Sequence, residues 1–477
     1  MKKILYVGAE VMPFAATGGL GDVMGSLPAS IAATGEADVR VVLPLYAAVS
    51  DVWRSQMKQE DVFYVDLAWR QQYCGVYSLQ KDGVTYYFID NEYYFKRPAL
   101  YGFFDDGERY AYFCMAVMEL MAHLNFYPDI LHAHDWQSAL SVVYLNCIYR
   151  NRPGYGGIRT AFTIHNIEYQ GIYDFAILGD VFALGENEHS LMDHSGCINL
   201  MKAAIECADR VTTVSPRYAE EIRTAEYAHG LEHCLNRNVH KLCGILNGID
   251  YSYYNPETDP AIAASFTPTR MAGKTKNKTA MQKEVGLPEQ KDIPLLAVIS
   301  RLASHKGLDI VAECIWDIVA NNDIQLIILG KGEPRYEQLF TDLESAYPDK
   351  VKALITYDRD LSKRIYAATD IFLMPSKSEP CGLSQMIASR YGAIPVVRET
   401  GGLYDSIKPY WVDGDKICGN GFTFANYSSY ELQECTETAI ALWNDAPARK
   451  KLVRKIMETD FSWKTSAEKY LELYAEL

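Results

Sequence analysis

Short apolar runs alternate with amphipathic segments along nearly the whole chain of 477 residues, and this alternation limits the folds open to it. Several runs are continuously apolar, as parallel strands covered on both faces must be. Segments such as Lys306–Ala320 and Leu361–Ala368 carry the helical pattern. Strand, helix, strand at this spacing predicts an α/β protein with two doubly wound sheets. The expected strands are Ile4–Val7, Val39–Leu43, Val84–Ile89, Ile130–Ala133, Thr160–Ile164 and Val211–Val214, then Leu295–Ile299, Ile324–Leu329, Val351–Ile355, Ile371–Met374 and Ile394–Val397.

The stretch Asn247–Ile293, rich in Pro, Thr, Asn and Lys, separates the two series of strands. We therefore place the domain boundary near its start, with an N-terminal Rossmann-like domain over residues 1–246. A chain of this length is expected to hold two or three domains.

Composition narrows the classes of partner and the compartment. The formal net charge is −15 and no Lys/Arg-rich run occurs, so we expect no nucleic-acid partner. The eleven cysteines include no C-x-x-C pair, which favours reduced thiols in the cytoplasm. The start MKKILYVGAEVMP resembles a signal peptide, but Glu10 interrupts its apolar run after six residues. No stretch approaches the roughly 20 apolar residues of a membrane span, and no membrane partner is expected.

Two glycine turns repeat, one in each half. Residues 16–22 (ATGGLGD) are similar to residues 399–405 (ETGGLYD), and each follows a predicted strand and opens a helical pattern. The glycines are explained either by tight turns or by backbone N–H groups that face a phosphate at a helix N-terminus. The second interpretation predicts a nucleotide-type anion held in the cleft between the domains.

Charged residues follow two strands of the second half. Arg301 and Lys306 come after the strand Leu295–Ile299, at the edge where doubly wound folds bind ligands. They are either solvated surface charges or the cations of a phosphate site. Glu379 follows the strand Ile371–Met374 and suits sugar hydroxyls, whereas the adjacent cysteine is either a nucleophile or a small packing residue.

Histidines end two strands of the first half. The sequence His132-Ala133-His134-Asp135 invites a zinc interpretation, but no third ligand lies at a suitable spacing. We expect instead a polar wall facing the substrate, shared with His165. A tyrosine cluster (Tyr86, Tyr87, Tyr93, Tyr94 and Tyr101) could stack on carbohydrate, although most such rings pack in the core.

Taken in order, these motifs resemble those of bacterial glycogen synthases and plant starch synthases along essentially the whole chain. Any one of them is a weak match, but their joint order and spacing make an accidental match very improbable. The markers are Glu10 with the TGGL turn, His132–Trp136, Phe162–Gly171, Val211–Tyr218, Leu246–Asp250, Ser300–Asp309, Pro375–Gln385 and Arg398–Leu403.

The resemblance implies a GT-B glycosyltransferase, in which two Rossmann-like domains face a deep cleft. Members transfer glucose from a sugar nucleotide, ADP-glucose in bacteria, to the non-reducing end of an α-1,4-glucan. They retain the anomeric configuration and use no metal and no cofactor. By this likeness residues 1–246 form the acceptor side, residues 247–455 the donor side, and residues 456–477 end in a helix, about Thr465–Glu476, that crosses back to the first domain.

The resemblance also implies roles by position. Arg301 and Lys306 match the pair that holds the donor diphosphate, and Glu379 matches the carboxylate that binds donor glucose. His165 is the further candidate for a catalytic role. Donor contacts are expected from Thr17, Gly18, Gly19, Asp22, Asn247, Tyr357, Cys381, Gly382, Leu383, Thr400 and Gly401, and acceptor contacts from Glu10, Asp135 and Tyr93.

One position departs from the family pattern. The family turn begins with lysine, as Lys-x-Gly-Gly-Leu, and here that position is Ala16. Losing a charge-assisted phosphate contact costs about 1.5–3 kcal/mol, or one to two decades in binding or rate. Two alternatives therefore stay open beside the ADP-glucose synthase: a glucan-binding or regulatory protein with little or no transfer activity, and a synthase that prefers another donor, such as UDP-glucose.

Overall fold

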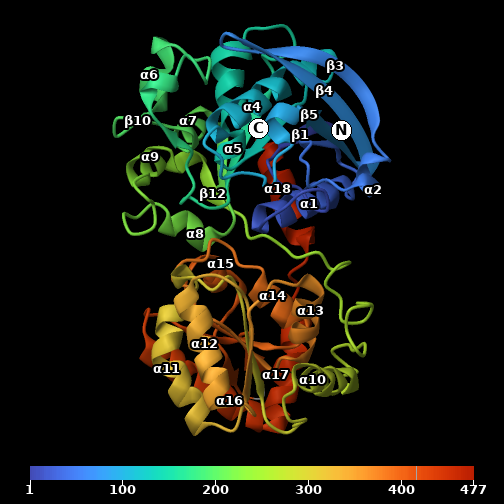
Figure 1. Cartoon of the computed structure of the whole chain (residues 1–477), viewed down its shortest axis with the longest axis vertical. Coiled ribbons are helices and arrows are strands. Elements are labelled where there is room, and N and C mark those ends of the chain that lie inside the picture. Colours follow the sequence, from blue (N-terminus) through green and yellow to red (C-terminus); the bar gives the residue numbers. More distant parts are fainter. Residues whose placement is uncertain (415) are drawn as a thin grey trace. The chain divides into compact units, whose positions relative to one another are not determined.

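The computed structural model describes every residue except Asp415, and the described residues divide into two compact units (Figure 1). Unit 1 comprises Met1–Asn247 together with Trp463–Leu477, and unit 2 comprises Gly248–Ser462. Both units are α/β, as the alternating pattern predicts. Within the described residues, no helix combines the length and the apolar character that a membrane crossing needs.

Unit 1 is built on one long sheet with the strand order β12-β11-β7-β6-β1-β2-β5-β4-β3. Neighbours from β12 to β5 run parallel, and β5, β4 and β3 pair antiparallel. The strands are β1 (Lys2–Val7), β2 (Ala37–Pro44), β3 (Lys58–Leu67), β4 (Arg70–Lys81), β5 (Val84–Asp90), β6 (Ile130–His134), β7 (Arg159–Ile164), β11 (Arg210–Thr213) and β12 (Leu242–Gly244), with β8 (Ile172–Tyr173), β9 (Asp193–His194) and β10 (Cys197–Asn199) in a small separate sheet.

The predicted strands of unit 1 are present, but the antiparallel hairpin β3–β4 was not expected. From Val62 to Leu67, residues of β3 alternate between exposed and buried because one face of this strand is open to solvent. The sequence did offer a signal for β3, the continuous apolar run Val62–Val65, which was missed.

Helices flank this sheet, and α5 packs against both α4 and α7. The helices of unit 1 are α1 (Gly19–Ala32), α2 (Asp51–Arg54), α3 (Glu92–Phe95), α4 (Asp106–His123), α5 (Trp136–Tyr144), α6 (His189–Met192), α7 (Leu200–Cys207), α8 (Pro216–Glu221), α9 (Glu232–Arg237) and α18 (Trp463–Ala475).

The last helix of the chain belongs to unit 1 although its sequence follows unit 2. Helix α18 packs against α1, and the Tyr474 hydroxyl lies 2.7 Å from the Tyr6 hydroxyl and 2.6 Å from His132 Nδ1. The segment expected as one piece from residue 456 is two helices here. Helix α17 runs to Glu458 in unit 2, and α18 begins at Trp463 after a turn in which Asp460 Oδ1 accepts the Ser462 N–H at 2.8 Å.

Unit 2 holds a sheet of parallel pairs in the order β15-β14-β13-β16-β17-β20. Its strands are β13 (Leu295–Ile299), β14 (Gln325–Leu329), β15 (Val351–Leu354), β16 (Ile371–Met374), β17 (Ile394–Arg398) and β20 (Phe422–Phe424), with a hairpin of β18 (Trp411–Asp413) and β19 (Lys416–Cys418). Its helices are α10 (Ala272–Val285), α11 (Leu308–Asn321), α12 (Pro334–Ala346), α13 (Arg359–Ala368), α14 (Ser384–Arg390), α15 (Gly401–Ser406), α16 (Ser429–Asn444) and α17 (Ala446–Glu458).

Helix α11 starts two residues later than the periodicity predicts, and the reason lies at Gly307. This residue has φ +76° and follows a short 3-10 turn, Ser304–Lys306. A Cβ at Gly307 would lie 1.9 Å from the carbonyl oxygen of Pro375. The glycine therefore allows the loop after β13 to approach the loop after β16, which brings Lys306 next to the segment that carries Glu379.

The polar stretch after Asn247 is a fixed part of unit 2. Its helix α10 is held by two buried lysines on neighbouring turns. The Lys274 ammonium lies 2.6 Å from the carbonyl oxygens of Thr369 and Tyr391, and Lys278 Nζ lies 2.6 Å from Asp370. The polar composition of this stretch marks the boundary between the two series of strands. It does not indicate that the stretch itself packs as part of unit 2.

Candidate active site

The predicted site residues of unit 1 lie at one edge of its sheet. Strands β7, β6 and β1 are neighbours, and a polar residue lies close after the end of each. Asp135 directly follows β6, His165 directly follows β7, and Glu10 is the third residue after β1. Because parallel strands end at the same edge, side chains far apart in sequence are brought together there.

The first glycine turn is closed on one side by Glu10. Its carboxylate accepts the Thr17 N–H at 2.5 Å, the Thr17 hydroxyl at 2.9 Å, the Gly18 N–H at 3.2 Å and the Tyr101 hydroxyl at 2.6 Å. The expectation that this turn presents bare N–H groups to phosphate is thus wrong for Thr17 and Gly18. The physical reason is that a nearby carboxylate, itself 3% exposed, satisfies them internally.

The other side of this turn is open. A Cβ at Gly18 or Gly19 would meet no atom within 4 Å, so packing within the protein does not require glycine at either position. Glycine here leaves room for a group outside the chain to approach the backbone closely. Asp22, the acidic residue in the first turn of α1, lies next along the same segment.

The second glycine turn has a different cause. A Cβ at Gly401 would lie 2.0 Å from the carbonyl oxygen of Glu379, and one at Gly402 would lie 2.1 Å from that of Cys381. The Gly402 N–H donates to the carbonyl of Glu379 at 3.1 Å. Close packing of two loops explains these glycines, a cause that neither interpretation of the repeated turn had named.

Asp135 joins two of the strand ends. It has φ +58° and ψ 177°, an unusual backbone conformation for a residue with a side chain. Its Oδ1 accepts the backbone N–H of His165 at 2.7 Å. Burial raises the pKa of Asp135 to about 7, because the carboxylate is removed from water.

His165 is neutral near physiological pH. Burial lowers its pKa to about 3, because the imidazolium form would be desolvated. Its Nε2 lies 2.9 Å from Nδ1 of His134. His165 can therefore hydrogen-bond a substrate but carries no charge with which to stabilise an anion.

The charged group of unit 2 is an ion pair rather than two separate cations. Lys306 Nζ lies 2.7 Å from Oε2 of Glu379, and the Ser376 hydroxyl donates to the same oxygen at 2.9 Å. Glu379 is 7% exposed, whereas Arg301 is exposed, with Nη2 3.4 Å from His305 Nε2. The sequence placed Lys306 and Glu379 at one sheet edge but did not indicate that they contact each other.

The remaining predicted residues fall into three settings. Thr400 and Cys381 are buried, and Gly382 takes a positive φ of +70° in the loop before α14, ahead of Leu383 at its N-terminus. Tyr357 and Tyr93 are 77% and 66% exposed, as rings that stack on a ligand must be. Asn247 is 5% exposed, and its Oδ1 has no hydrogen-bond partner among the described residues.

Two expectations about the aromatic and imidazole groups have different outcomes. The polar wall is wrong for His132 and His134, which are fully buried, because their rings pack in the core beneath the strand ends. In the tyrosine cluster, Tyr86, Tyr87 and Tyr94 are buried, as expected for packing residues.

Sequence reasoning missed Ser376 and the role of Tyr101. Ser376 lies in the Pro375–Gln385 motif, so its position beside Glu379 was a usable signal. Tyr101 reaches Glu10 from 91 residues away, and no local pattern predicts that contact.

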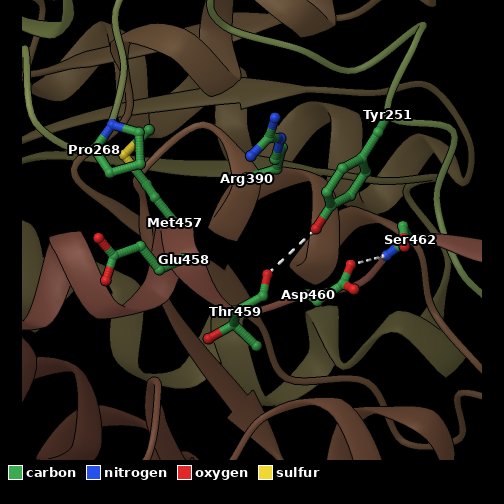
Figure 2. A pocket seen from close by; sticks show the side chains of 8 residues that line it. All are labelled: Tyr251, Pro268, Arg390, Met457, Glu458, Thr459, Asp460 and Ser462. Carbon is green, nitrogen blue, oxygen red and sulfur yellow. Dashed lines mark hydrogen bonds between the residues drawn. The ribbon is translucent and has the colours of Figure 1, made fainter. Parts of the chain in front are cut away.

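The described residues contain no cluster of three His, Cys, Asp or Glu side chains suited to a metal ion. They do contain a pocket of about 430 Å³ in unit 2, lined by Tyr251, Pro268, Arg390, Met457, Glu458, Thr459, Asp460 and Ser462 (Figure 2). Arg390 and Glu458 end α14 and α17, and the pocket includes none of the predicted site residues.

The raised pKa of Asp135 predicts a pH-dependent gain of stability in Asp135→Asn. The folded chain binds the proton more tightly than the unfolded chain, so this group makes wild-type stability fall as pH rises from about 4 to about 7. Asparagine tolerates positive φ and does not titrate. The free energy of unfolding of the variant, minus that of wild type, should grow by about 2–4 kcal/mol across this window in urea titrations.

The exposed residue Ser190 supplies the control, since Ser190→Ala removes no titratable group and should show a difference from wild type that does not vary with pH. A constant difference for Asp135→Asn as well would contradict the raised pKa.

Comparisons with known proteins agree along the whole chain. Residues 3–237 match the family model described as starch synthase catalytic domain, and residues 278–456 match glycosyl transferases group 1. The chain is 47% identical over 479 residues to a glycogen synthase of Streptococcus agalactiae, with all of both chains covered. It is 44% identical to a glycogen synthase of Geobacillus stearothermophilus, covering 100% of this chain and 98% of that one.

Solved structures show the same relationship. The catalytic domain of starch synthase IV from Arabidopsis thaliana, bound to ADP and acarbose, superposes with a TM-score of 0.91 at 35% identity, covering 100% of this chain and 99% of that one. Sucrose-phosphate synthase from Thermosynechococcus elongatus, at 16% identity and a TM-score of 0.62 over 100% and 99% of the two chains, shares the fold alone. With two α/β units, charged loops at the strand ends and full-length relatives, the chain belongs to the glycogen synthase and starch synthase family of GT-B glycosyltransferases.

Proposed function

We propose that this glycosyltransferase transfers glucose from ADP-glucose to the non-reducing end of an α-1,4-glucan, such as glycogen, with retention of configuration. The observation that carries the proposal is the group formed by Lys306, Glu379 and Ser376, with Arg301 on the loop after the neighbouring strand β13. It combines cations for a diphosphate with a carboxylate for sugar hydroxyls, in a chain of this family.

The donor assignment rests on charge and on one relative. Transfer leaves negative charge on the departing nucleotide, and the cations Arg301 and Lys306 are suited to stabilise it. The Glu379 carboxylate holds the Lys306 ammonium at 2.7 Å, which limits its freedom before the donor arrives. The starch synthase IV domain was solved with ADP, which favours an adenine nucleotide over UDP.

Retention follows in our proposal from attack on the face that the nucleotide leaves. The acceptor oxygen bonds to the anomeric carbon as the bond to the diphosphate oxygen breaks, ADP takes that electron pair, and the acceptor proton passes to a diphosphate oxygen. His165 is neutral and its Nε2 is already hydrogen-bonded, so we assign it to binding a sugar oxygen rather than to forming a covalent intermediate.

The acceptor is assigned to unit 1. Tyr93 offers an exposed ring, and Glu10 and Asp135 offer carboxylates at the sheet edge. Aromatic faces with nearby hydrogen-bonding groups suit pyranose rings. We further place the protein in the cytoplasm, where the eleven thiols, free in this structure, stay reduced.

The first test is ADP release with glycogen and ADP-glucose, run beside UDP-glucose. Wild type should release ADP only when glycogen is present, and Glu379→Gln should lower kcat at least about 100-fold, because the Lys306 ammonium loses its carboxylate partner and the sugar loses an acceptor. The control is Glu344→Gln, which removes the carboxylate from another partly buried ion pair of unit 2, with Lys352, and should keep the activity.

Silence with both donors from a protein that binds glycogen would favour the glucan-binding alternative, and a UDP preference would correct the donor. A fully active, folded Glu379→Gln would overturn the assignment of the site.

Restoring lysine at position 16 should strengthen donor binding. Ala16 is half-buried and adjoins the Gly18–Gly19 turn, and its Cβ lies against Gly21, at which an added Cβ would be 2.2 Å away. An ammonium there would add a charge-assisted contact to phosphate worth about 1.5–3 kcal/mol. We expect Ala16→Lys to lower the KM for ADP-glucose by about tenfold or more in steady-state assays. Ala16→Met, of similar length without charge, is the control, and equal KM values for the two variants would refute a charge effect.

We also propose that transfer needs no metal ion, as the family resemblance implies. The glycogen-dependent rate should be unchanged after dialysis against EDTA, because Arg301 and Lys306 supply the positive charge themselves. A rate that falls in EDTA and returns with magnesium would show that a cation assists the departure of the nucleotide.

A further inference from the structure

The proposed mechanism assigns no role to His134, a buried polar residue of unit 1. His134 ends strand β6 and is fully buried. Its Nδ1 lies 2.9 Å from Nε2 of His165, and its Nε2 has no hydrogen-bond partner among the described residues. A buried nitrogen without a partner costs stability and requires a reason.

Both imidazoles are neutral, so only one of the two nitrogens that face each other in this hydrogen bond carries a hydrogen atom. Burial lowers the pKa of His165 to about 3 and that of His134 well below its usual value, because either cation would be desolvated. A neutral imidazole has one donor and one acceptor nitrogen. Therefore either His134 Nδ1–H donates to His165 Nε2, or His165 Nε2–H donates to His134 Nδ1.

The unpartnered nitrogen decides between these two arrangements. If His165 were the donor, His134 would carry its proton on Nε2 and bury an N–H group with no acceptor. If His134 is the donor, its Nε2 buries only a lone pair. Orphaned buried N–H groups are rarer in proteins than under-used acceptors, which favours His134 as the donor.

The ring of His134 is also held in orientation by two neighbouring rings. Its centroid lies 4.2 Å from that of His132 and 5.7 Å from that of Tyr6. His132 is fixed in turn by Tyr474 of α18 at Nδ1 and by the Thr163 hydroxyl at Nε2, both at 2.6 Å. This packing keeps the Nδ1 of His134 directed at His165.

We infer that His134 is a positioning residue, which donates its Nδ1 proton to His165 and thereby holds His165 as the Nδ1–H tautomer. That tautomer leaves the Nδ1–H of His165 to donate to a substrate oxygen, while its Nε2 accepts from the protein. This inference rests on the proposed function, because it assigns His165 to contact the sugar. Selecting a tautomer through the hydrogen bond on the other ring nitrogen is a general device of enzyme sites.

Two substitutions of His134 distinguish the effect of its Nδ1–H hydrogen bond from the effect of its packing. In His134→Asn the amide N–H can occupy the place of Nδ1, whereas in His134→Gln the longer amide lies nearer the place of Nε2. We expect kcat for glycogen-dependent ADP release to fall about 10- to 100-fold in the Gln variant and to stay within about threefold of wild type in the Asn variant. The KM for ADP-glucose should change less than kcat in both variants.

A readout without turnover comes from nitrogen-15 NMR of the full chain labelled at histidine, in which His165 is assigned from its loss in His165→Asn. Wild type and His134→Asn should show His165 protonated at Nδ1, and His134→Gln should show a mixture of tautomers. Because this measurement needs no transfer, it tests the tautomer even if the proposed function fails.

Tyr155→Phe provides the matched control for lost stability. It removes a buried hydroxyl that donates to the Met118 carbonyl and has no part in holding His132, His134 or His165, so the melting temperature should fall while kcat and the His165 tautomer stay as in wild type. Three results would overturn the inference: a wild-type His165 protonated at Nε2, equal kcat in the Asn and Gln variants, or a changed tautomer in Tyr155→Phe. If neither His134 variant folds, the wild-type spectrum alone decides.

Discussion

The parallel hydrogen-bonded register of the two main sheets is the constraint on which both candidate sites depend. Parallel pairing places the carboxyl ends of neighbouring strands at a common edge. In unit 1 the pairing of β7, β6 and β1 brings His165, Asp135 and Glu10 to one edge. In unit 2 the pairing of β13 with β16 brings Lys306 within 2.7 Å of Glu379, across 73 residues of chain. Both sites are thus consequences of strand order.

Glu10 and Asp135 at these edges hydrogen-bond to other parts of unit 1, and these contacts set what the two groups can do. The Glu10 carboxylate holds the first glycine turn, and Asp135 holds the backbone of His165. Burial then changes protonation, because it raises the pKa of Asp135 and lowers that of His165. The result is a set of neutral or internally bonded groups in unit 1 and a charged group in unit 2. This division suits a hydroxyl-bearing sugar on one side and a diphosphate on the other.

The sequence was most informative about features that a short segment determines by itself. Continuous apolar runs located the buried strands, and polar residues directly after them located the sheet edge. The two glycine turns show the limit of such reasoning, because their sequences are similar but their causes differ. Gly401 and Gly402 are required by close loop packing, whereas the space beside Gly18 and Gly19 is open. The hairpin β3–β4 was missed although β3 contains the apolar run Val62–Val65, in which Val62 and Tyr64 face solvent.

By itself, the sequence determined the α/β class, the strands that form the parallel part of each sheet except β12 and β20, the order of the motifs and the residue types available at each strand end. These follow from hydrophobic periodicity and from family resemblance, both of which are properties of short segments and their spacing. The tertiary structure decided which of these residues meet: Glu379 with Lys306, Tyr101 with Glu10, and His134 with His165. Such contacts join residues from about 30 to 90 positions apart. These contacts require atoms from distant segments to be placed to within a few tenths of an ångström and to be buried. No local sequence pattern encodes either property.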